Sequence, residues 1–556
     1  MPSFEVSRHV QPKFIFNSRR SPVYFTKGMV ASSQPLATEA GLEMLRVGGN
    51  AADAAIAVAA ALAVIEPCST GLGGDGFALF YNAASKKVIS LNGSGKSPHK
   101  MTLKKIQGMG IRESLPTRHG LTVNVPGACA MWCDLIDRFG TLPLSKIFAP
   151  AITYAKEGFP VSPITASLWK TGEGEVLTTS QGGMNLLLNG KAPRAGEIMH
   201  NQTLGEILRQ LASRTPQEAR KLFYTGEIAK RIVKATRENG GMLSIDDMAE
   251  HESLWGESIK TEYRGYEVHE CPPNGQGLAA LLALNTLEQI NLVEKGEPCS
   301  AKRLHYQIEA MRMGFADARL HITDPHIYET PLKTLLSKEY GTKRVLEINS
   351  DKANPDAKHG IPVNSSDTVY FNVIDQDGNG CSMVNSIYMN FGTGIVPDGL
   401  GFPLQNRGHN FSLAPEHPNV LAPGKRTYHT IIPGICLRKN GSLHSVFGVM
   451  GGFMQPQGHM QVISAMLDDG ADPQEALNRL RFCIESGEAG GKVCLEEGIP
   501  KETIEQLSEM GHQVEIRSGY ERMLFGRGQI ISRDEETGTL CAGCDPRSDG
   551  VAGGIC

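Results

Sequence analysis

The sequence is poor in aromatic residues and has no long run of lysine or arginine. Phe, Trp and Tyr make up 6% of the 556 residues, and 55 basic against 59 acidic side chains leave a net charge of −4. A protein with this charge balance lacks the basic surface that binds phosphate backbones, so we expect no nucleic-acid partner.

Apolar segments long enough for a membrane are also missing. The most apolar stretch, residues 51–65, is rich in alanine, contains Asp53 and is shorter than a transmembrane helix. The first 20 residues contain no unbroken apolar run of signal-peptide length. The 12 cysteines are dispersed, mostly among apolar neighbours, which is typical of a reducing compartment. We therefore expect a soluble cytoplasmic protein with no membrane contact.

The common nucleotide and metal motifs are absent. Residues 93–97 (GSGKS) end like a P-loop, but the glycine that begins a P-loop would fall at Ser90. The 16 histidines form no HExxH pair, so a metallohydrolase is not indicated. Cys541 and Cys544 form a single CxxC without a second pair, which favours two buried thiols over a structural zinc site.

The chain contains a predominantly helical first part and a strand-rich end. Residues 35–47 and 50–65 have helical patterns, with Asn50 as the N-cap of the second helix. Strands are expected near residues 71–80 and 87–91, and mainly helices from residue 142 to 349.

A β-hairpin is predicted directly after a polar loop at residues 349–365. Two apolar runs, 369–374 and 381–387, flank the turn sequence DQDGN. If the turn centres near Gly378, facing positions sum to about 755, and Thr368 lies opposite Ser386 or Ile387. A threonine before such a strand is by itself an ordinary β-residue.

The stretch 367–379 (DTVYFNVIDQDGN) resembles the processing site of the γ-glutamyltransferase family, which belongs to the N-terminal-nucleophile hydrolases. The resemblance runs from about residue 28 to Arg547. It is carried further by GGNAADA at 48–54, GGDG at 73–76, VPG at 125–127, DP at 324–325, FGTGIV at 391–396, PNV at 418–420, GKR at 424–426, MGG at 450–452 and DPR at 545–547.

The resemblance implies an α+β fold, a four-layer αββα sandwich with a largely helical part in the large subunit. It also implies a precursor, or zymogen, that cuts itself between Asp367 and Thr368. The products would be a large subunit, 1–367, and a small subunit, 368–556, which share one structural core. These subunits are each other's partners, and a higher homo-oligomer stays open.

The implied chemistry centres on Thr368 as the nucleophile. A threonine hydroxyl needs an adjacent base, and cleavage frees an α-amine with a pKa of about 7.7–8.0 next to it. The resemblance further assigns Ser386 as a second hydroxyl that orients this amine, and Gly451 and Gly452 as the oxyanion hole. No metal or organic cofactor is expected.

Several substrate-facing positions depart from the best-known family members, which bind a γ-glutamyl group. Ser94 stands where those members have the arginine that holds the substrate's α-carboxylate. The other departures are Tyr388, Arg407, Asn410, His429 and Thr430. Together they look closer to the branch that contains oxamate amidohydrolase and glutathione hydrolase-like proteins. Arg407 and Lys96 would then hold the carboxylate of a small anionic amide, although Lys96 also fits a solvated surface position.

Three hypotheses follow for the function. The first is a self-processing amidohydrolase or acyltransferase that cleaves a small amide through an acyl-Thr intermediate. The second is a γ-glutamyl hydrolase or transpeptidase that acts on glutathione and its conjugates. The third is an unprocessed binding protein that has kept the fold without catalysis.

Overall fold

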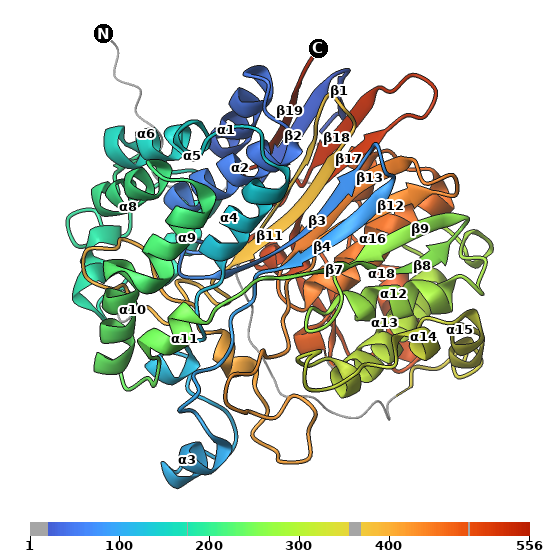
Figure 1. Ribbon diagram of the computed structural model, residues 1–556. Helices are drawn as coiled ribbons and strands as arrows, with labels where there is room; N and C mark the ends of the chain where they lie inside the picture. Colours follow the sequence, from blue (N-terminus) through green and yellow to red (C-terminus); the bar gives the residue numbers. More distant parts are fainter. Residues whose placement is uncertain (1–19, 175, 355–367, 488–489) are drawn as a thin grey trace, which may run out of the picture.

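The computed structural model describes residues 20–174, 176–354, 368–487 and 490–556. Two seven-stranded antiparallel sheets form its centre (Figure 1). In spatial order, the first sheet contains β1 (Val23–Phe25), β18 (Leu540–Cys544), β17 (Arg527–Arg533), β13 (Leu443–Met450), β12 (Gly434–Arg438), β9 (Tyr266–Glu270) and β8 (Ile259–Tyr263). The second contains β19 (Val551–Ile555), β2 (Gly28–Ser32), β10 (Val369–Ile374), β11 (Gly380–Ser386), β3 (Asp75–Asn82), β4 (Lys87–Asn92) and β7 (Leu254–Glu257).

The two sheets pack face to face, and helices cover both outer faces. A continuous apolar cluster, including Phe77, Tyr370 and Val446, fills the space between the sheets. Burial of such side chains on the inner faces is what holds two sheets together. The described structure is therefore the four-layer α+β sandwich that the resemblance implies.

One helical layer covers the second sheet (Figure 1). Its members are α1 (Pro35–Arg46), α2 (Ala51–Ile65), α4 (Ala128–Phe139), α5 (Leu144–Ile147), α6 (Ala149–Glu157), α8 (Gln202–Ala212), α9 (Pro216–Thr225), α10 (Glu227–Glu238) and α11 (Ile245–Ala249). The predicted start of α2 is confirmed: Asn50 accepts from the amides of Ala52 and Asp53, and Asp53 accepts from the Asn50 amide. This capping box lets a fully buried, alanine-rich helix begin cleanly behind β10 and β11.

The other helical layer covers the first sheet. It contains α12 (Gly277–Leu287), α13 (Ala301–His321), α14 (Leu332–Leu335), α15 (Lys338–Val345), α16 (Met454–Asp469), α17 (Pro473–Asn478) and α18 (Lys501–Glu509). The smaller elements are α3 (Leu103–Gly108), α7 (Pro163–Thr171), β5 (Phe159–Pro160), β6 (Ile198–Met199), β14 (Phe482–Ile484), β15 (Val493–Glu496) and β16 (Val514–Arg517).

The region from residue 142 to 349 is mainly helical, as predicted, but it also contains β5, β6, β7, β8 and β9, which the prediction did not name. In β8 the buried residues Ile259, Thr261 and Tyr263 alternate with exposed ones. That period of two is the pattern of a half-buried strand, and it is short enough to be hidden among charged helical segments. The predicted loop at 349–365 lies outside the described residues from 355 onward.

Each central sheet takes strands from both sides of residue 368. The first sheet joins β1, β8 and β9 with β12, β13, β17 and β18, and the second joins β2, β3, β4 and β7 with β10, β11 and β19. A cut before Thr368 would therefore leave hydrogen-bonded strands of both pieces in both sheets. Over the part of the chain that the structure describes, we find no helix that combines the length and apolarity needed to cross a bilayer.

Candidate active site

Thr368 lies at the start of β10, where the predicted hairpin brings it next to Ser386. Val369 faces Asn385 and Ile374 faces Gly380, so the register continues to Thr368 opposite Ser386. The two hydroxyl oxygens are 3.0 Å apart, and both residues are fully buried. Asp367, the residue before the expected cut, lies outside the described residues.

The Ser386 hydroxyl is oriented by two N–H donors. Its oxygen accepts from the backbone amide of Tyr388 at 2.8 Å and from Arg407 Nη2 at 3.3 Å. A hydroxyl that accepts twice uses both lone pairs, which leaves its hydrogen as the group that it donates. Ser386 is therefore arranged as a hydrogen-bond donor close to Thr368.

Arg407 is a fully buried cation beside this pair. Its Nη1 donates to Thr430 Oγ1 at 2.7 Å, and its guanidinium lies 4.2 Å from the centre of the Tyr388 ring. Burial lowers the pKa of Arg407 to about 10, so it keeps its charge at neutral pH. Among the described residues its Nε has no hydrogen-bond partner. A buried N–H of a cation is thus left to bind an anionic acceptor.

Tyr388 has a strained backbone that presents its ring to Arg407. Its φ of +78° lies in the left-handed region that side-chain-bearing residues rarely adopt. The phenol donates to Asn410 Oδ1 at 2.5 Å, and Asn410 in turn donates to the carbonyl of Tyr428. Tyr388 and Asn410 therefore form one rigid wall beside the hydroxyl pair.

His429 is hydrogen-bonded to Asp75, a buried acidic residue next to Ser386. Asp75 faces Ser386 across β3 and β11, and its Oδ2 accepts from His429 Nε2 at 3.0 Å. Burial raises the pKa of Asp75 to about 7, against the lowering charge of Arg407. Burial lowers the pKa of His429 well below its usual value, with Arg407 adding to the effect, so the imidazole is neutral.

Gly451 and Gly452 form the turn between β13 and α16. Their φ values are +136° and +60°, a conformation that glycine adopts without strain. The turn leads into the positively polarised N-terminus of the sixteen-residue helix α16. Gln276, which sequence reasoning did not single out, donates from Nε2 to the carbonyls of Gly452 and Thr430. Gln276 thereby connects the glycine pair to Thr430, which accepts a hydrogen bond from Arg407. Arg407 in turn contacts Ser386, the neighbour of Thr368.

Arg527 is a second residue that the sequence did not indicate. Its Nη2 lies 3.5 Å from the carbonyl oxygen of Thr368, and its Nη1 pairs with the buried carboxylate of Glu66 at 3.2 Å. Glu66 also accepts from the hydroxyls of Ser33 and Ser69. The backbone carbonyl of Thr368 is therefore held by Arg527, and Arg527 is held in turn by its ion pair with Glu66.

The contacts recorded for the two remaining predicted residues, Ser94 and Lys96, are with groups other than Arg407. The Ser94 hydroxyl donates to Asn92 Oδ1 at 2.7 Å, within a polar cluster that includes Asn274. Lys96 lines a small cavity of about 20 Å³ together with Ser97, His99, Val125, Asp247, Glu250 and His251. A site shared by Lys96 and Arg407 stays a prediction.

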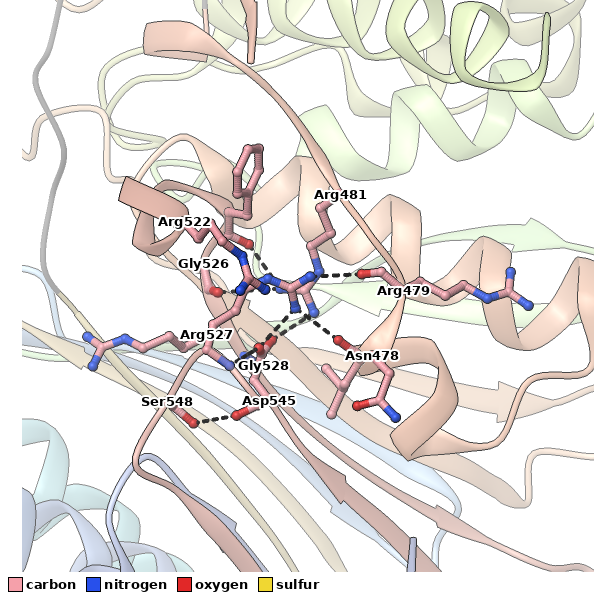
Figure 2. Close-up of polar contacts among 12 residues, drawn as sticks. Asn478, Arg479, Arg481, Arg522, Gly526, Arg527, Gly528, Asp545 and Ser548 are labelled. Atoms are coloured by element: carbon pink, nitrogen blue, oxygen red, sulfur yellow. Dashed lines mark hydrogen bonds and ion pairs between the residues drawn. The ribbon is translucent and has the colours of Figure 1, made fainter. Parts of the chain in front are cut away.

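A buried ion-pair network supports the strand that carries Arg527 (Figure 2). Arg481 Nη2 pairs with Asp545 Oδ2 at 2.8 Å, and Arg481 Nη1 donates to the carbonyl of Phe525 at 2.9 Å. Asp545 also accepts from the Gly528 amide and pairs with Arg547. Figure 2 shows the Arg527 side chain pointing away from this network. The network fixes the turn at Gly526. This turn packs closely against Gly451, since a Cβ added to Gly451 would lie only 3.2 Å from the Cα of Gly526.

Replacing Asp545 by asparagine should destabilise the protein by about 3–5 kcal/mol, because Arg481 would lose its carboxylate partner and remain as a poorly compensated buried charge, while Arg547 keeps Glu496. Arg481 and Arg547 hold the pKa of Asp545 below its usual value in spite of burial, so the carboxylate is charged in the folded chain. Urea unfolding of the full chain measures the loss. The exposed Asp398→Asn is the matched control, expected to change stability by less than about 0.5 kcal/mol. Equal stability of the two variants would contradict a structural role for the network.

The two-sheet sandwich with helical outer layers, and a threonine at the start of a central strand, define an N-terminal-nucleophile hydrolase fold. A family model described as Gamma-glutamyltranspeptidase matches residues 37–555. The chain belongs to this family of amidohydrolases and acyltransferases.

Similar proteins span nearly the whole chain. A cephalosporin acylase from Bacillus halodurans superposes with a TM-score of 0.89 and 42% identity, covering 100% of this chain and 99% of that one. The glutathione hydrolase-like YwrD proenzyme of Bacillus subtilis is 38% identical over 534 residues, which are 95% of this chain and 99% of the relative. The oxamate amidohydrolase proenzyme of Klebsiella pneumoniae is 30% identical over 537 residues, 95% and 98% of the two chains.

Proposed function

We propose that the chain cuts itself between Asp367 and Thr368 and that the new N-terminal Thr368 is the nucleophile of an amidohydrolase. The observation that carries this proposal is the 3.0 Å contact between the Thr368 and Ser386 hydroxyls, with Arg407 bound to the same Ser386 oxygen. The motif at 367–379 and the proenzyme relatives support it.

Cleavage supplies the base that the threonine lacks. Inside the chain, the Thr368 nitrogen is an amide and cannot accept a proton, whereas the freed α-amine has a pKa of about 7.7–8.0. The amine takes the proton of Oγ1 as that oxygen attacks the substrate carbonyl carbon, and it passes the proton to the leaving nitrogen. Water then attacks the acyl-Thr ester, and the carboxylic acid leaves. Ser386 donates to Thr368 Oγ1 and holds that oxygen with its own hydrogen directed at the amine lone pair.

The oxyanion that forms in each step is stabilised by the backbone N–H groups of Gly451 and Gly452. Their turn begins α16, so the helix dipole adds to the stabilisation. Gln276 holds the carbonyl of Gly452 at 2.8 Å and keeps this turn in place relative to Thr430 and Arg407. No step requires a metal or an organic cofactor.

We infer that the acyl group is small and carries a carboxylate. The unpartnered Nε of Arg407 offers a charge-assisted hydrogen bond close to the nucleophile. In this proposal the bound acyl group is surrounded by Tyr388, His429, Thr430 and Asn410. The Ser94 hydroxyl already donates to Asn92. Lys96 is not part of this proposal, because its recorded neighbours are Ser97, Asp247 and His251 rather than Arg407.

A γ-glutamyl hydrolase or transpeptidase acting on glutathione is the alternative, and the relative labelled glutathione hydrolase-like favours it. Cephalosporin side-chain amides are a further substrate class, because a cephalosporin acylase covers the whole chain at 42% identity.

Purified protein tests both parts of the proposal. A denaturing gel should show bands near 40 and 20 kDa, since 60.1 kDa is divided at residue 367, and the smaller band should begin at Thr368. Oxamate, glutathione, a γ-glutamyl anilide and a cephalosporin amide are then assayed in parallel. If only the γ-glutamyl compounds are turned over, the protein is a γ-glutamyl hydrolase or transpeptidase and the small-amide proposal is wrong. An active preparation that consists of one intact polypeptide would refute the nucleophile assignment.

A further inference from the structure

His305, Glu309 and His512 form a buried cluster that the proposed reaction does not use. The side chains of His305 and Glu309 lie one turn apart on α13, and His512 follows α18, which packs against α13 (Figure 1). One nitrogen or oxygen from each residue lies within 4.8 Å of the other two. The residues are at most 4% exposed.

The hydrogen bonds of the two histidines determine where their protons are. His305 Nε2 lies 2.7 Å from the carbonyl oxygen of Asn349, which can only accept, so Nε2 carries the hydrogen. His305 Nδ1 then has a lone pair, which points at His512 Nε2 at 2.8 Å. An imidazole whose second nitrogen donates to a carbonyl is the usual form of a metal-binding histidine.

Two atoms of the cluster have no hydrogen-bond partner among the described residues. They are His512 Nδ1 and Glu309 Oε1. The other Glu309 oxygen accepts from the amide of Asn354, and Arg312 Nε lies 3.5 Å from Oε1 as an ion pair. A buried carboxyl group and two imidazoles are thus brought together, and one imidazole nitrogen, His512 Nδ1, has no hydrogen-bond partner in the described part of the chain.

We propose that His305 Nδ1, His512 Nε2 and the Glu309 carboxylate bind one divalent transition-metal ion of the zinc type, with water as the fourth ligand. Two nitrogens and one carboxylate favour zinc over calcium or magnesium, which require mainly oxygen ligands. Zinc–nitrogen bonds of about 2.0–2.1 Å at a tetrahedral angle separate the two nitrogens by about 3.3 Å. The rings therefore move apart by about 0.5 Å, and His512 shifts its proton from Nε2 to the unpartnered Nδ1.

The ion would connect parts of the chain that the proposed cleavage separates. His305 and Glu309 precede residue 368 and His512 follows it, and the same side chains hold the Asn349 carbonyl and the Asn354 amide. The site is structural, since none of its residues belongs to the group around Thr368. This bridging role rests on the proposed cleavage, whereas metal binding itself does not.

Metal binding is tested on the full chain after dialysis against a chelator. Addition of Zn²⁺ should give about one ion per chain by elemental analysis, and Co²⁺ should give the intense visible absorption of a four-coordinate site. His305→Gln and Glu309→Gln should each weaken binding at least about 10-fold, the lower limit seen even for outer-sphere changes. His459→Gln is the matched control, because His459 is equally buried and binds a carboxylate, Glu270, at 2.6 Å without a second histidine. It should bind metal like the unchanged chain.

The same titration with Thr368→Ala separates the two proposals, since the uncut precursor should also bind one ion. Absence of stoichiometric binding to the unchanged chain would mean that the cluster is only a hydrogen-bonded histidine pair. Equal affinity of the His305→Gln, Glu309→Gln and unchanged chains would likewise overturn the site. If the unchanged chain is cut, added Zn²⁺ should slow the separation of its two pieces in denaturant. No effect on that rate would overturn the bridging role.

Discussion

Replacing Thr368 by alanine should leave a single polypeptide of about 60 kDa with no amidohydrolase activity. The hydroxyl is proposed to act twice, first on the carbonyl of Asp367 during cleavage and then on the substrate. Without Oγ1 neither ester can form, and without cleavage the α-amine that serves as base never appears. The expected loss is complete within the sensitivity of the assay, as judged by gel and by product formation.

Thr368→Ser is the matched control. It keeps the oxygen that lies 3.0 Å from Ser386 but removes a methyl group from a fully buried position. We expect this variant to be cut, more slowly than the unchanged chain, and to retain measurable turnover. Normal maturation of Thr368→Ala would show that another residue is the nucleophile.

Replacing Arg407 by leucine should spare the cut and impair turnover of an anionic acyl substrate. A charge-assisted hydrogen bond contributes about 1.5–3 kcal/mol, which corresponds to a loss of roughly 10- to 150-fold in kcat/KM. Arg407→Lys keeps the charge but not the planar fork, so its loss should be smaller. Steady-state kinetics of the processed variants gives both values.

A substrate with an uncharged acyl group distinguishes two roles for Arg407. The same guanidinium donates to Ser386 at 3.3 Å, so it could act only by orienting that hydroxyl. If Arg407 holds the substrate carboxylate, the leucine variant should lose much less activity toward the uncharged substrate. Equal losses toward both substrates would remove Arg407 from carboxylate binding and leave it as a positioning residue.

Several features of the fold follow from local sequence. Asn50 as N-cap predicts the start of α2, and the structure adds Asp53 as its capping-box partner within one helical turn. The turn at 375–379 and two apolar runs predict the hairpin and place Thr368 opposite Ser386 or Ile387, and the structure has Ser386. Both features depend on hydrogen bonds between residues close together in the sequence, so a short stretch of sequence is enough to predict them.

The surroundings of the site could not be predicted in this way. Gln276, Arg527 and Glu66 are ordinary polar residues in sequence, and they reach the site only because strands and helices far apart in the chain pack together. For the same reason, the sequence could not show that Arg407 bonds to Thr430 and Ser386, or that Lys96 lines a small cavity with Asp247 and His251.

The sequence by itself determined the family, the hairpin and the hydroxyl pair, because these depend on motifs and on spacing along one stretch of chain. Tertiary packing alone decided which charges are buried and paired. Arg407 Nε was left without a partner, Asp545 was surrounded by arginines, and His512 was brought to His305 from 207 residues away. The physical reason is that burial and ion pairing depend on distances in space, which the order of residues does not specify until the sheets have packed.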